Sequence, residues 1–304
     1  MNLVPARSFL PRAALAACAL GLSLIAGAAA AAARAERPTV VEAVQSPAWV
    51  ERNGERIPAT PGMSLRERDH IITGASSRIL LRLPEGSTVK LGENASFLLA
   101  NSALGRDNVY VAAMNVLEGA FRFTTEAVAK FRGRRAVQVQ FFQVTAGIRG
   151  TDLWGKQAGD RDIVCLIEGR IEVQRGAEAP IAMDQPLSFY IAPRGRPSLP
   201  VAPVPRAQID AWSAETEIAP GRGALRRGGV WKVTLASPDT QQDALRLYDE
   251  VRAAGYAATL APEMEGEKHL YHVRLAQVPS RGDAQALADA LRGRFGIADP
   301  QVSR

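Results

Sequence analysis

The sequence predicts two folded regions of different class: an all-β region, either a sandwich or a solenoid-like stack of hairpins, followed by a smaller α+β unit. Two observations lead to this prediction. Residues 39–192 contain many short alternating or β-branched segments separated by turns, and no helical period. Residues 229–302 instead contain one strand-then-helix pattern written twice. The chain has 304 residues, enough for two ordinary domains, and 47% of them are hydrophobic, as in globular proteins.

Residues 1–35 have the features of an export signal. Arg7 and Arg12 provide a positive flank, a long Ala-rich apolar stretch follows, and a final Ala-Arg-Ala has the small residues that a signal peptidase reads. We expect cleavage before Glu36 and a periplasmic mature protein. Two alternatives stay open: the sequence LAAC ending at Cys18 resembles a lipoprotein box, and an uncleaved stretch would anchor the protein in the inner membrane.

Composition gives no strong evidence for a nucleic-acid partner. The formal net charge is +6, but three arginines lie in the expected signal, and without them 34 basic residues face 31 acidic ones, a net charge of +3.

The sequence contains two cysteines, Cys18 and Cys165. Removal of Cys18 with the signal leaves Cys165 alone, without a partner for an internal disulfide. Its apolar setting, DIVCLIEG, predicts a buried structural thiol.

Three turns in the β-rich region share one form, in which an apolar strand end is followed by one residue and then Glu-Gly. They are centred on Gly86, Gly119 and Gly169. Glycine permits the positive φ that tight hairpins require, so the recurrence predicts stacked or repeated hairpins.

The basic sequence KFRGRRAV, residues 130–137, fits a solvated hairpin loop better than a site for anionic lipid or nucleic acid.

The β-rich region resembles the FecR domain over about residues 65–175. The resemblance is carried by ITGASSRILLRLPEGSTVKLGENASFLL, then VTAGIRGTDLW, then CLIEGRIEVQ, in that order. It implies a β-rich extracytoplasmic scaffold or sensor. Some members of the family relay signals to sigma factors, but this sequence lacks the cytoplasmic helical segment and mid-chain membrane span that such a relay needs.

The most specific part of this resemblance is Arg149-Gly150-Thr151, which follows an extended strand and precedes an aromatic residue. Arg149 and Asp152 can be interpreted as a surface docking pair. The alternative is that Gly147 and Gly150 shape a turn while Arg149 satisfies local carbonyl groups. We favour the second interpretation because turn chemistry explains both glycines without a ligand.

Residues 193–228 have the composition of a linker between the two regions, which we place at 36–192 and 229–304. The linker begins with PRGRPSLPVAPVP, which has five prolines in thirteen residues and is expected to be extended and semi-rigid. The following RAQIDAWSAETE is compatible with a short helix that packs Ile209 and Trp212 onto a domain. The last part, PGRGALRRGG, is expected to be flexible and basic.

Two amphipathic helices are predicted in the C-terminal region, at about 241–254 and 282–295. In both, apolar residues recur at positions i, i+3, i+4 and i+7, on one helix face. Gly255 stands where a C-cap belongs and Ser280 where an N-cap belongs. A strand precedes each helix, and GYAATLAPE and IADPQV supply the outer strands. The order β-α-β-β-α-β predicts a ferredoxin-like arrangement, with two helices on one face of a four-stranded sheet.

Strand alternation sorts the side chains of the two central strands into two sets. The polar set, expected to line the open face of the sheet, is Lys232, Thr234, His272 and Arg274. The set expected to face the helices is Trp231, Val233, Leu235, Tyr271, Val273 and Leu275. An open face with hydrogen-bonding groups and cations can bind an extended polymer. RNA is disfavoured as that polymer because the aromatic residues required for base stacking alternate inward.

Neither a metal, nor a cofactor, nor a catalytic site is expected. The chain has three histidines, and the odd separation of His269 and His272 puts them on opposite faces of a strand, so they do not ligate one ion together. The sequence contains no Gly-x-Ser-x-Gly, no phosphate loop and no paired active-site cysteine. We therefore expect a binding protein and not an enzyme.

The C-terminal region resembles the SPOR domain, a module of bacterial envelope and cell-division proteins. The sequence WKVTLASPDTQQDALRLYDEVRAAGY followed by YHVRLAQVPSRGDAQALADALRGRFG matches its two-part pattern over about residues 229–302. The most distinctive portion starts at Ser280-Arg281 and Asp283-Ala284. The resemblance implies that the polar open-face set binds peptidoglycan, in particular glycan strands stripped of stem peptides.

Two positions depart from the family pattern. Thr234 stands where the family often has Gln, which removes an amide from the presumed sugar face, and Pro238 stands where it often has Phe. The expected function is a periplasmic envelope protein that binds peptidoglycan through its SPOR-like domain and uses its FecR-like domain as a scaffold or sensor. The alternative is an envelope signalling or assembly module whose SPOR-like domain binds a protein partner.

Overall fold

The computed structural model of the chain describes residues 38–105, 108–125, 133–148 and 150–304. The expected export signal with Cys18, the start of the expected basic loop and Arg149 lie outside the described residues. In the part of the chain that is described, no helix is long and apolar enough to cross a membrane.

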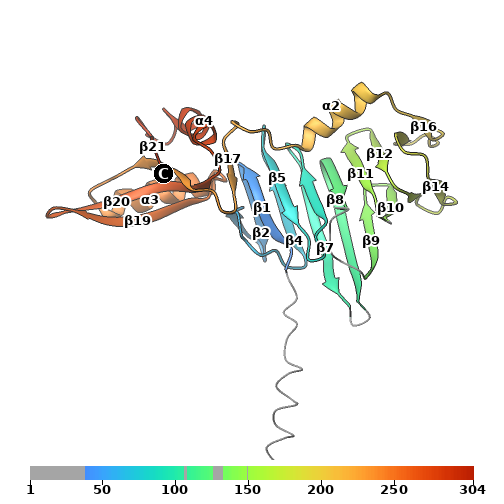
Figure 1. Cartoon of the computed structure of the whole chain (residues 1–304), viewed down its shortest axis with the longest axis horizontal. Helices are drawn as coiled ribbons and strands as arrows, with labels where there is room; N and C mark the ends of the chain where they lie inside the picture. Colours follow the sequence, from blue (N-terminus) through green and yellow to red (C-terminus); the bar gives the residue numbers. More distant parts are fainter. Residues whose placement is uncertain (1–37, 106–107, 126–132, 149) are drawn as a thin grey trace, which may run out of the picture. The chain divides into compact units, whose positions relative to one another are not determined.

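The first region is built almost wholly from strands, as predicted (Figure 1). Its strands are β1 (Val40–Gln45), β2 (Ala48–Arg52), β3 (Glu55–Pro58), β4 (Asp69–Thr73), β5 (Arg78–Arg82), β6 (Thr88–Leu91), β7 (Ser96–Leu104), β8 (Val109–Thr124), β9 (Arg134–Gln140), β10 (Val144–Ile148), β11 (Asp152–Ala158), β12 (Arg161–Glu168), β13 (Ile171–Arg175), β14 (Ile181–Met183), β15 (Ser188–Pro193), β16 (Ala202–Pro203) and β17 (Ala224–Arg226).

These strands form two sheets joined through β8. One runs in the order β17-β1-β5-β6-β8-β11-β12-β15-β16. The other runs in the order β3-β2-β4-β7-β8-β9-β10-β13-β14. Neighbouring strands are antiparallel except for the parallel pair β8 and β9.

Strand β8 belongs to both sheets because it bends at Gly119. Its residues up to Glu118 pair with β7 or β9, whereas Gly119 to Thr124 pair with β6 or β11. Gly119 has a φ of 84°, and a Cβ there would lie 2.7 Å from the Cα of Ala95. The prediction of a hairpin turn at Gly119 is therefore wrong, because the chain continues in strand conformation through the bend. Gly86 and Gly169 do lie in turns with positive φ.

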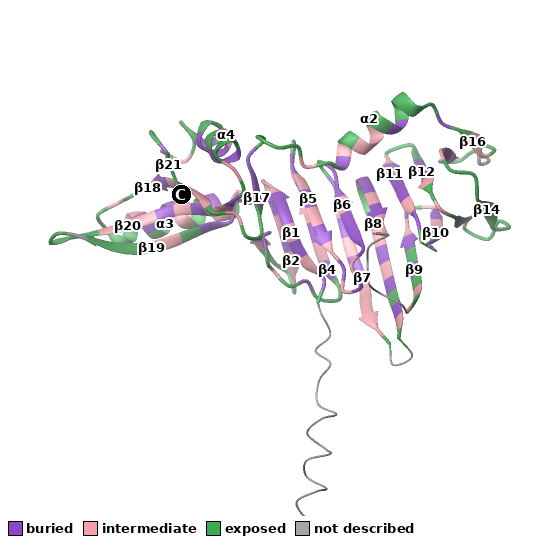
Figure 2. Cartoon of the chain, in the orientation of Figure 1, coloured by how far each residue is buried: buried purple, intermediate pink, exposed green. Residues whose placement is uncertain are grey.

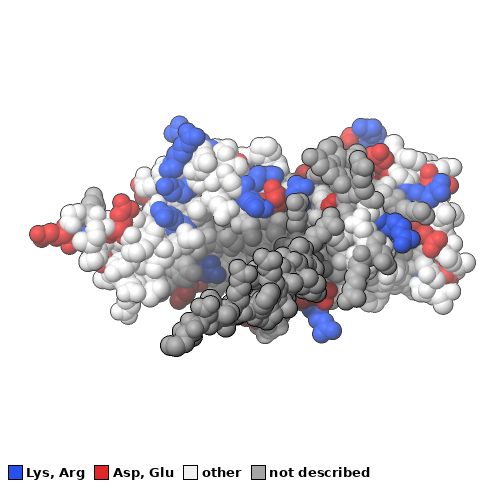
Figure 3. Space-filling model, turned by 60° about the horizontal axis from the view of Figure 1, so that its bottom comes forward, with Lys and Arg blue, Asp and Glu red and all other residues white. Residues whose placement is uncertain are grey.

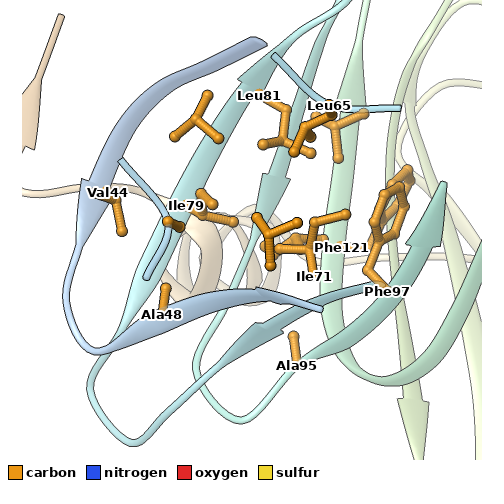
Figure 4. Close-up of a cluster of buried hydrophobic side chains, with 14 of the residues drawn as sticks. Val44, Ala48, Leu65, Ile71, Ile79, Leu81, Ala95, Phe97 and Phe121 are labelled. Carbon is orange, nitrogen blue, oxygen red and sulfur yellow. The ribbon is translucent and has the colours of Figure 1, made fainter. Parts of the chain in front are cut away.

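Alternate side chains of the two sheets meet in a common hydrophobic core, visible as the buried positions in Figure 2. Ile71 and Phe97 from one sheet lie near Ile79, Leu81 and Phe121 from the other (Figure 4). The rings of Phe97 and Phe121 stack with centroids 5.8 Å apart. Burial of each such side chain contributes about 1.5–3 kcal/mol, so this core accounts for the pairing of the two layers.

Residues 193–228 are structured along part of their length. Helix α2 (Arg206–Thr216) follows β16 and packs Ile209 and Trp212 onto the β-rich region, as predicted. After it, β17 adds to the edge of one sheet by pairing with β1.

The C-terminal unit consists of β18 (Trp231–Ala236), α3 (Gln241–Ala253), β19 (Ala258–Glu265), β20 (Lys268–Val278), α4 (Arg281–Leu291) and β21 (Gln301–Ser303). Its antiparallel sheet has the order β19-β20-β18-β21. The buried residues of the two helices are Ala244, Leu247 and Val251 in α3 and Asp283, Ala284, Leu287, Ala288 and Leu291 in α4. All but Asp283 belong to the predicted apolar faces.

The helix ends follow the cap residues, with one correction. Ser280 accepts a hydrogen bond from the backbone N–H of Asp283 at 3.0 Å and so caps α4 as predicted. Helix α4 ends at Leu291 and not near Phe295, because Gly293 and Gly296 adopt positive φ in a tight turn. Phe295 nevertheless contacts Tyr256 edge to face, with ring centroids 6.5 Å apart.

Candidate functional site

The central strands of the C-terminal sheet separate buried from accessible side chains as alternation requires. Val233 and Leu235 on β18, like Val273 and Leu275 on β20, are buried in the hydrophobic core. The four predicted open-face residues are half-buried instead: Lys232, Thr234, His272 and Arg274. Trp231 and Tyr271 are partly buried and pack against the core.

Strand register brings one polar residue from each strand into a row. Thr234 lies opposite Arg274 across β18 and β20, and opposite Gln301 across β18 and β21. Arg274 in turn lies opposite Thr259 on β19. Because directly opposite residues share a face of a sheet, these four side chains form a line of amide, hydroxyl, guanidinium and hydroxyl groups. With strands about 4.8 Å apart, the line is about 14 Å long, which suits an extended ligand crossing the strands.

Two cations on this face are available to a ligand. Within the described residues, neither Lys232 nor Arg274 has an ion pair or a side-chain hydrogen bond. Lys232 lies opposite Ser303 at the β21 edge, so the two cations come from different strands. A desolvated carboxylate between them would form charge-assisted hydrogen bonds, which are about twice as strong as neutral ones.

His272 is held in place by both of its ring nitrogens. Its Nδ1 lies 2.7 Å from the Oγ of Ser237, and its Nε2 lies 3.1 Å from a carboxylate oxygen of Glu263. A ring with both nitrogens occupied has no free donor or acceptor for a ligand. In the structure His272 therefore lies beside the row with a fixed ring orientation and without free hydrogen-bonding capacity.

Sequence reasoning missed Gln301 and Thr259. Both lie on edge strands, whose partners are set by sheet order and cannot be read from alternation within one strand. The amide nitrogen of Gln301 donates to the Asp299 carboxylate at 2.6 Å, and its side-chain carbonyl oxygen is the group that can accept a hydrogen bond from a ligand. The Gln301 amide on β21 thus lies next to Thr234, the position on β18 where the SPOR family often has Gln.

The Ser280–Asp283 pair has a structural role away from this row. Asp283 is 2% exposed, and its Oδ1 accepts hydrogen bonds from the backbone N–H groups of Gly221, Gly223 and Ala224 at 2.9–3.3 Å. Its Oδ2 accepts from the hydroxyl of Ser280 at 2.5 Å. This carboxylate fastens the segment before β18 to the start of α4.

In the β-rich region, the motif around Gly150 also has a mainly structural setting. Gly150 has a φ of 65°, and Thr151 is buried. A Cβ on Gly169 would lie 2.4 Å from the carbonyl oxygen of Gly150, so the two turns pack backbone against backbone. Asp152 forms a two-point ion pair with Arg122, at 2.9 and 2.7 Å, instead of standing free for docking. Gly147 lies within β10 and does not form the turn predicted for it.

Two protein families match the chain, in the order expected from the sequence. The FecR protein family matches residues 69–172, and the SPOR domain matches residues 228–302. The chain therefore carries a FecR region followed by a SPOR domain. No curated protein matches its sequence.

Two crystal structures of a protein assigned as an anti-sigma factor from Parabacteroides distasonis ATCC 8503 are similar to the chain at low level. The first has 16% sequence identity and a TM-score of 0.39, and covers 73% of this chain and 89% of that one. The second has 15% identity, a TM-score of 0.38 and the same coverage. TM-scores this low support no conclusion about fold or function.

Proposed function

We propose, with a FecR region and a SPOR domain in one chain as the premise, that this protein is a non-enzymatic component of the bacterial cell envelope that binds peptidoglycan. The SPOR domain is assigned the binding role and the FecR region that of a periplasmic scaffold or sensor. The helix and strand order of the C-terminal unit supports a ferredoxin-like arrangement, in which the helices cover one face and leave the other to a ligand.

The observation that carries the proposal is the row Gln301, Thr234, Arg274 and Thr259, with Lys232 at its side. A polysaccharide offers hydroxyls and amides along an extended chain, and the row offers matching donors and acceptors on four neighbouring strands. The face of the molecule shown in Figure 3 does not favour nucleic acid. Figure 3 shows basic and acidic side chains distributed over the displayed face without one continuous field of either sign.

The glycan strand that fits best is one without stem peptides. Removal of the peptide from the lactyl group leaves a free carboxylate, and Lys232 and Arg274 are two cations without a protein partner in the described part of the chain. A peptide-bearing strand offers no carboxylate at this place and a bulky branch instead. We therefore assign denuded strands as the ligand, and export of the chain to the periplasm by its N-terminal signal as the route to it.

Sedimentation of the purified full chain with sacculi tests this assignment. We expect the protein to pellet with sacculi, and more of it to pellet after an amidase has removed the stem peptides. Failure to pellet with either preparation would refute glycan binding, whereas equal pelleting with both would refute only the preference for denuded strands. A fluorescent fusion that follows denuded glycan to the division site would extend the role to cell division.

A second candidate function is an envelope signalling or assembly module whose SPOR domain binds protein. The observation in its favour is Thr234, whose short hydroxyl side chain reaches less far than an amide would. Cross-linking in cells distinguishes the two. One dominant protein adduct through the C-terminal domain that survives glycan digestion would favour the second candidate.

A further inference from the structure

Helix α2 covers a separate apolar strip on the β-rich region. The strip is distinct from the main core and consists of Ala120, Trp154, Ile163, Cys165, Ile167, Leu187 and Phe189. Along β11, Leu153 points into the main core while Trp154 belongs to this strip, so the strip lies on the opposite face of the sheet. Trp154 is fully buried, and Ile209 and Trp212 of α2 belong to the cluster that covers it.

The contact between α2 and the strip has a definite chemistry. Trp212 stacks on Trp154 with ring centroids 4.8 Å apart and planes inclined by 5°. One turn further along, the carboxylate of Glu215 lies 2.8 Å from the Nζ of Lys156. Glu217, at the end of the helix, pairs with Lys90 and, at 3.2 Å, with Arg122. Trp212, Glu215 of α2 and Glu217 just after it therefore meet Trp154 and three cations, which come from the neighbouring strands β6, β8 and β11.

The first turn of α2 is fastened by buried Ile209 but lacks a side-chain cap and a buried ion pair. Pro205 gives the helix no side-chain N-cap, and the first-turn pair Arg206–Asp210 is 81% and 69% exposed. A half-open pocket of about 390 Å³ lies beside this half of the helix and is lined by Arg206, Asp210, Ile167 and Leu187, while Ile209 itself is buried against the strip. An isolated helix of eleven residues is marginal in water, so α2 depends on the packing of Ile209 and Trp212 on the strip and on the ion pair of Glu215.

Both flanks of α2 are fixed independently of the helix. On the N-terminal side, β16 pairs with β15, and the N–H of Val204 donates to the carbonyl of Leu187 at 2.8 Å. On the C-terminal side, Asp283 holds Gly221 and Gly223. Release of α2 would therefore expose the strip without unfolding the sheet or the C-terminal unit.

We propose that this strip is a docking site for an amphipathic helix of a partner protein, and that α2 is its built-in competitor. The partner helix places an aromatic residue over Trp154 and, three positions later, a carboxylate against Lys156, with a further acid against Arg122. Charge complementarity specifies this partner, because Lys156 pairs with Glu215 of α2 and Lys90 with Glu217 at its end, while Arg122 pairs with Glu217 as well as with Asp152 of the sheet. The proposal concerns the β-rich region and stands whether or not the SPOR domain binds glycan.

A peptide with the sequence of residues 205–218, PRAQIDAWSAETEI, tests the site in trans. We expect it to bind the full-length Trp212→Ala variant at least about tenfold more tightly than the wild type, since about 1.4 kcal/mol of lost self-competition gives that ratio. Fluorescence anisotropy measures the affinity. The same peptide with Ala at the Trp position is the ligand control, and circular dichroism checks that the variant is folded. A folded Trp212→Ala protein that does not bind the peptide overturns the proposal.

Alkylation of Cys165 gives a second readout that does not depend on Trp212. The thiol is 1% exposed and lies under α2, so its reaction with a maleimide requires the helix to open. We expect Glu215→Gln to speed modification several-fold, measured by mass spectrometry of the Cys165 peptide, and the added peptide to slow it again. Asp210→Asn removes a carboxylate of the same helix that reaches only Arg206, and is expected to react like the wild type.

Equal modification rates in Glu215→Gln and Asp210→Asn would show that α2 does not control access to the strip, and would overturn the proposal. Concentration-dependent dimers of the wild type that disappear in Trp212→Ala would assign the strip to α2 of a second copy. That outcome would overturn the assignment to a different protein.

Discussion

Gln301 on β21 lies directly opposite Thr234 on β18, so an amide and a hydroxyl are neighbours in the polar row of the SPOR domain. The amide that the strand of Thr234 lacks is thus present one strand away. If glycan binding uses this place, we expect Gln301→Ala to weaken binding by about tenfold, the effect of one lost hydrogen bond of about 1.5 kcal/mol. Sedimentation with amidase-treated sacculi measures it. Affinity that stays at the wild-type level would show that the ligand avoids the β21 edge.

The cations Lys232 and Arg274 are expected to contribute most of the affinity. Each charge-assisted contact is worth about 1.5–3 kcal/mol when well formed, so the double Ala variant should lose at least about 100-fold. Its thermal unfolding should change little, because neither side chain is buried. Arg246→Ala is the control for loss of a positive charge away from the row and is compared with each single variant, because Arg246 lies on α3 and is 71% exposed. Undiminished binding by the double variant would place the site elsewhere.

Asp283 is expected to be essential for stability and not for binding. Its replacement by Ala leaves three backbone N–H groups and the Ser280 hydroxyl without their acceptor. With about 1–3 kcal/mol for each unsatisfied buried donor, we expect a loss of at least about 3 kcal/mol in the free energy of unfolding, measured with urea. Asp289→Ala, on the exposed side of the same helix, should cost less than about 1 kcal/mol. Similar costs for the two variants would contradict the anchoring role.

Stability is expected to depend on pH through Glu85 in the β-rich region. Burial raises the pKa of its carboxyl group, although Arg135 lies 3.9 Å away. Because the pKa is higher in the folded chain than in the unfolded one, Glu85 stabilises the fold fully below about pH 4.3, and this contribution is lost as the pH rises through the folded value. Glu85→Gln should therefore raise the urea midpoint at neutral pH, and the gain should shrink in acid. A lower midpoint for the variant at neutral pH would mean that the pairing with Arg135 outweighs burial.

The thiol of Cys165 is expected to be unreactive in the folded protein. Burial raises its pKa to about 12, so almost no thiolate forms near neutral pH. Modification should instead require α2 to open. Its rate should then rise with pH in the same way as that of an ordinary exposed thiol. Rapid modification of the wild type at neutral pH, at the rate of a free thiol, would contradict burial of this residue.

Alternation within a strand was sufficient to place Lys232, Thr234, His272 and Arg274 away from the core, because side chains on a strand repeat with period two. It could not supply Gln301 or Thr259, since their positions depend on which strands become neighbours. For the same reason it could not show that both nitrogens of His272 are occupied. Contacts between strands are set by the tertiary fold, whereas alternation is local.

Glycines were harder to interpret than apolar patterns. The Glu-Gly form predicts a positive φ at Gly119, which is correct, but positive φ serves a bend within β8 as well as a hairpin. In α4 the apolar period continues to Phe295, yet Gly293 ends the helix because it takes up positive φ. The role of Asp283 could not be predicted from the sequence. Its partners are backbone N–H groups between Gly221 and Ala224, about sixty residues away in the chain, and no side-chain pattern marks them.

The anchoring of Gly221–Ala224 by Asp283 limits how the SPOR domain can be transplanted. The family match begins at residue 228, so an excised domain cut at that boundary would contain the buried carboxylate but none of the backbone donors that satisfy it. A cut before Gly221 would carry its own donors. A SPOR domain excised for grafting or fusion should therefore begin before Gly221 and not at residue 228, because the backbone N–H groups of Gly221 to Ala224 satisfy the buried Asp283 carboxylate.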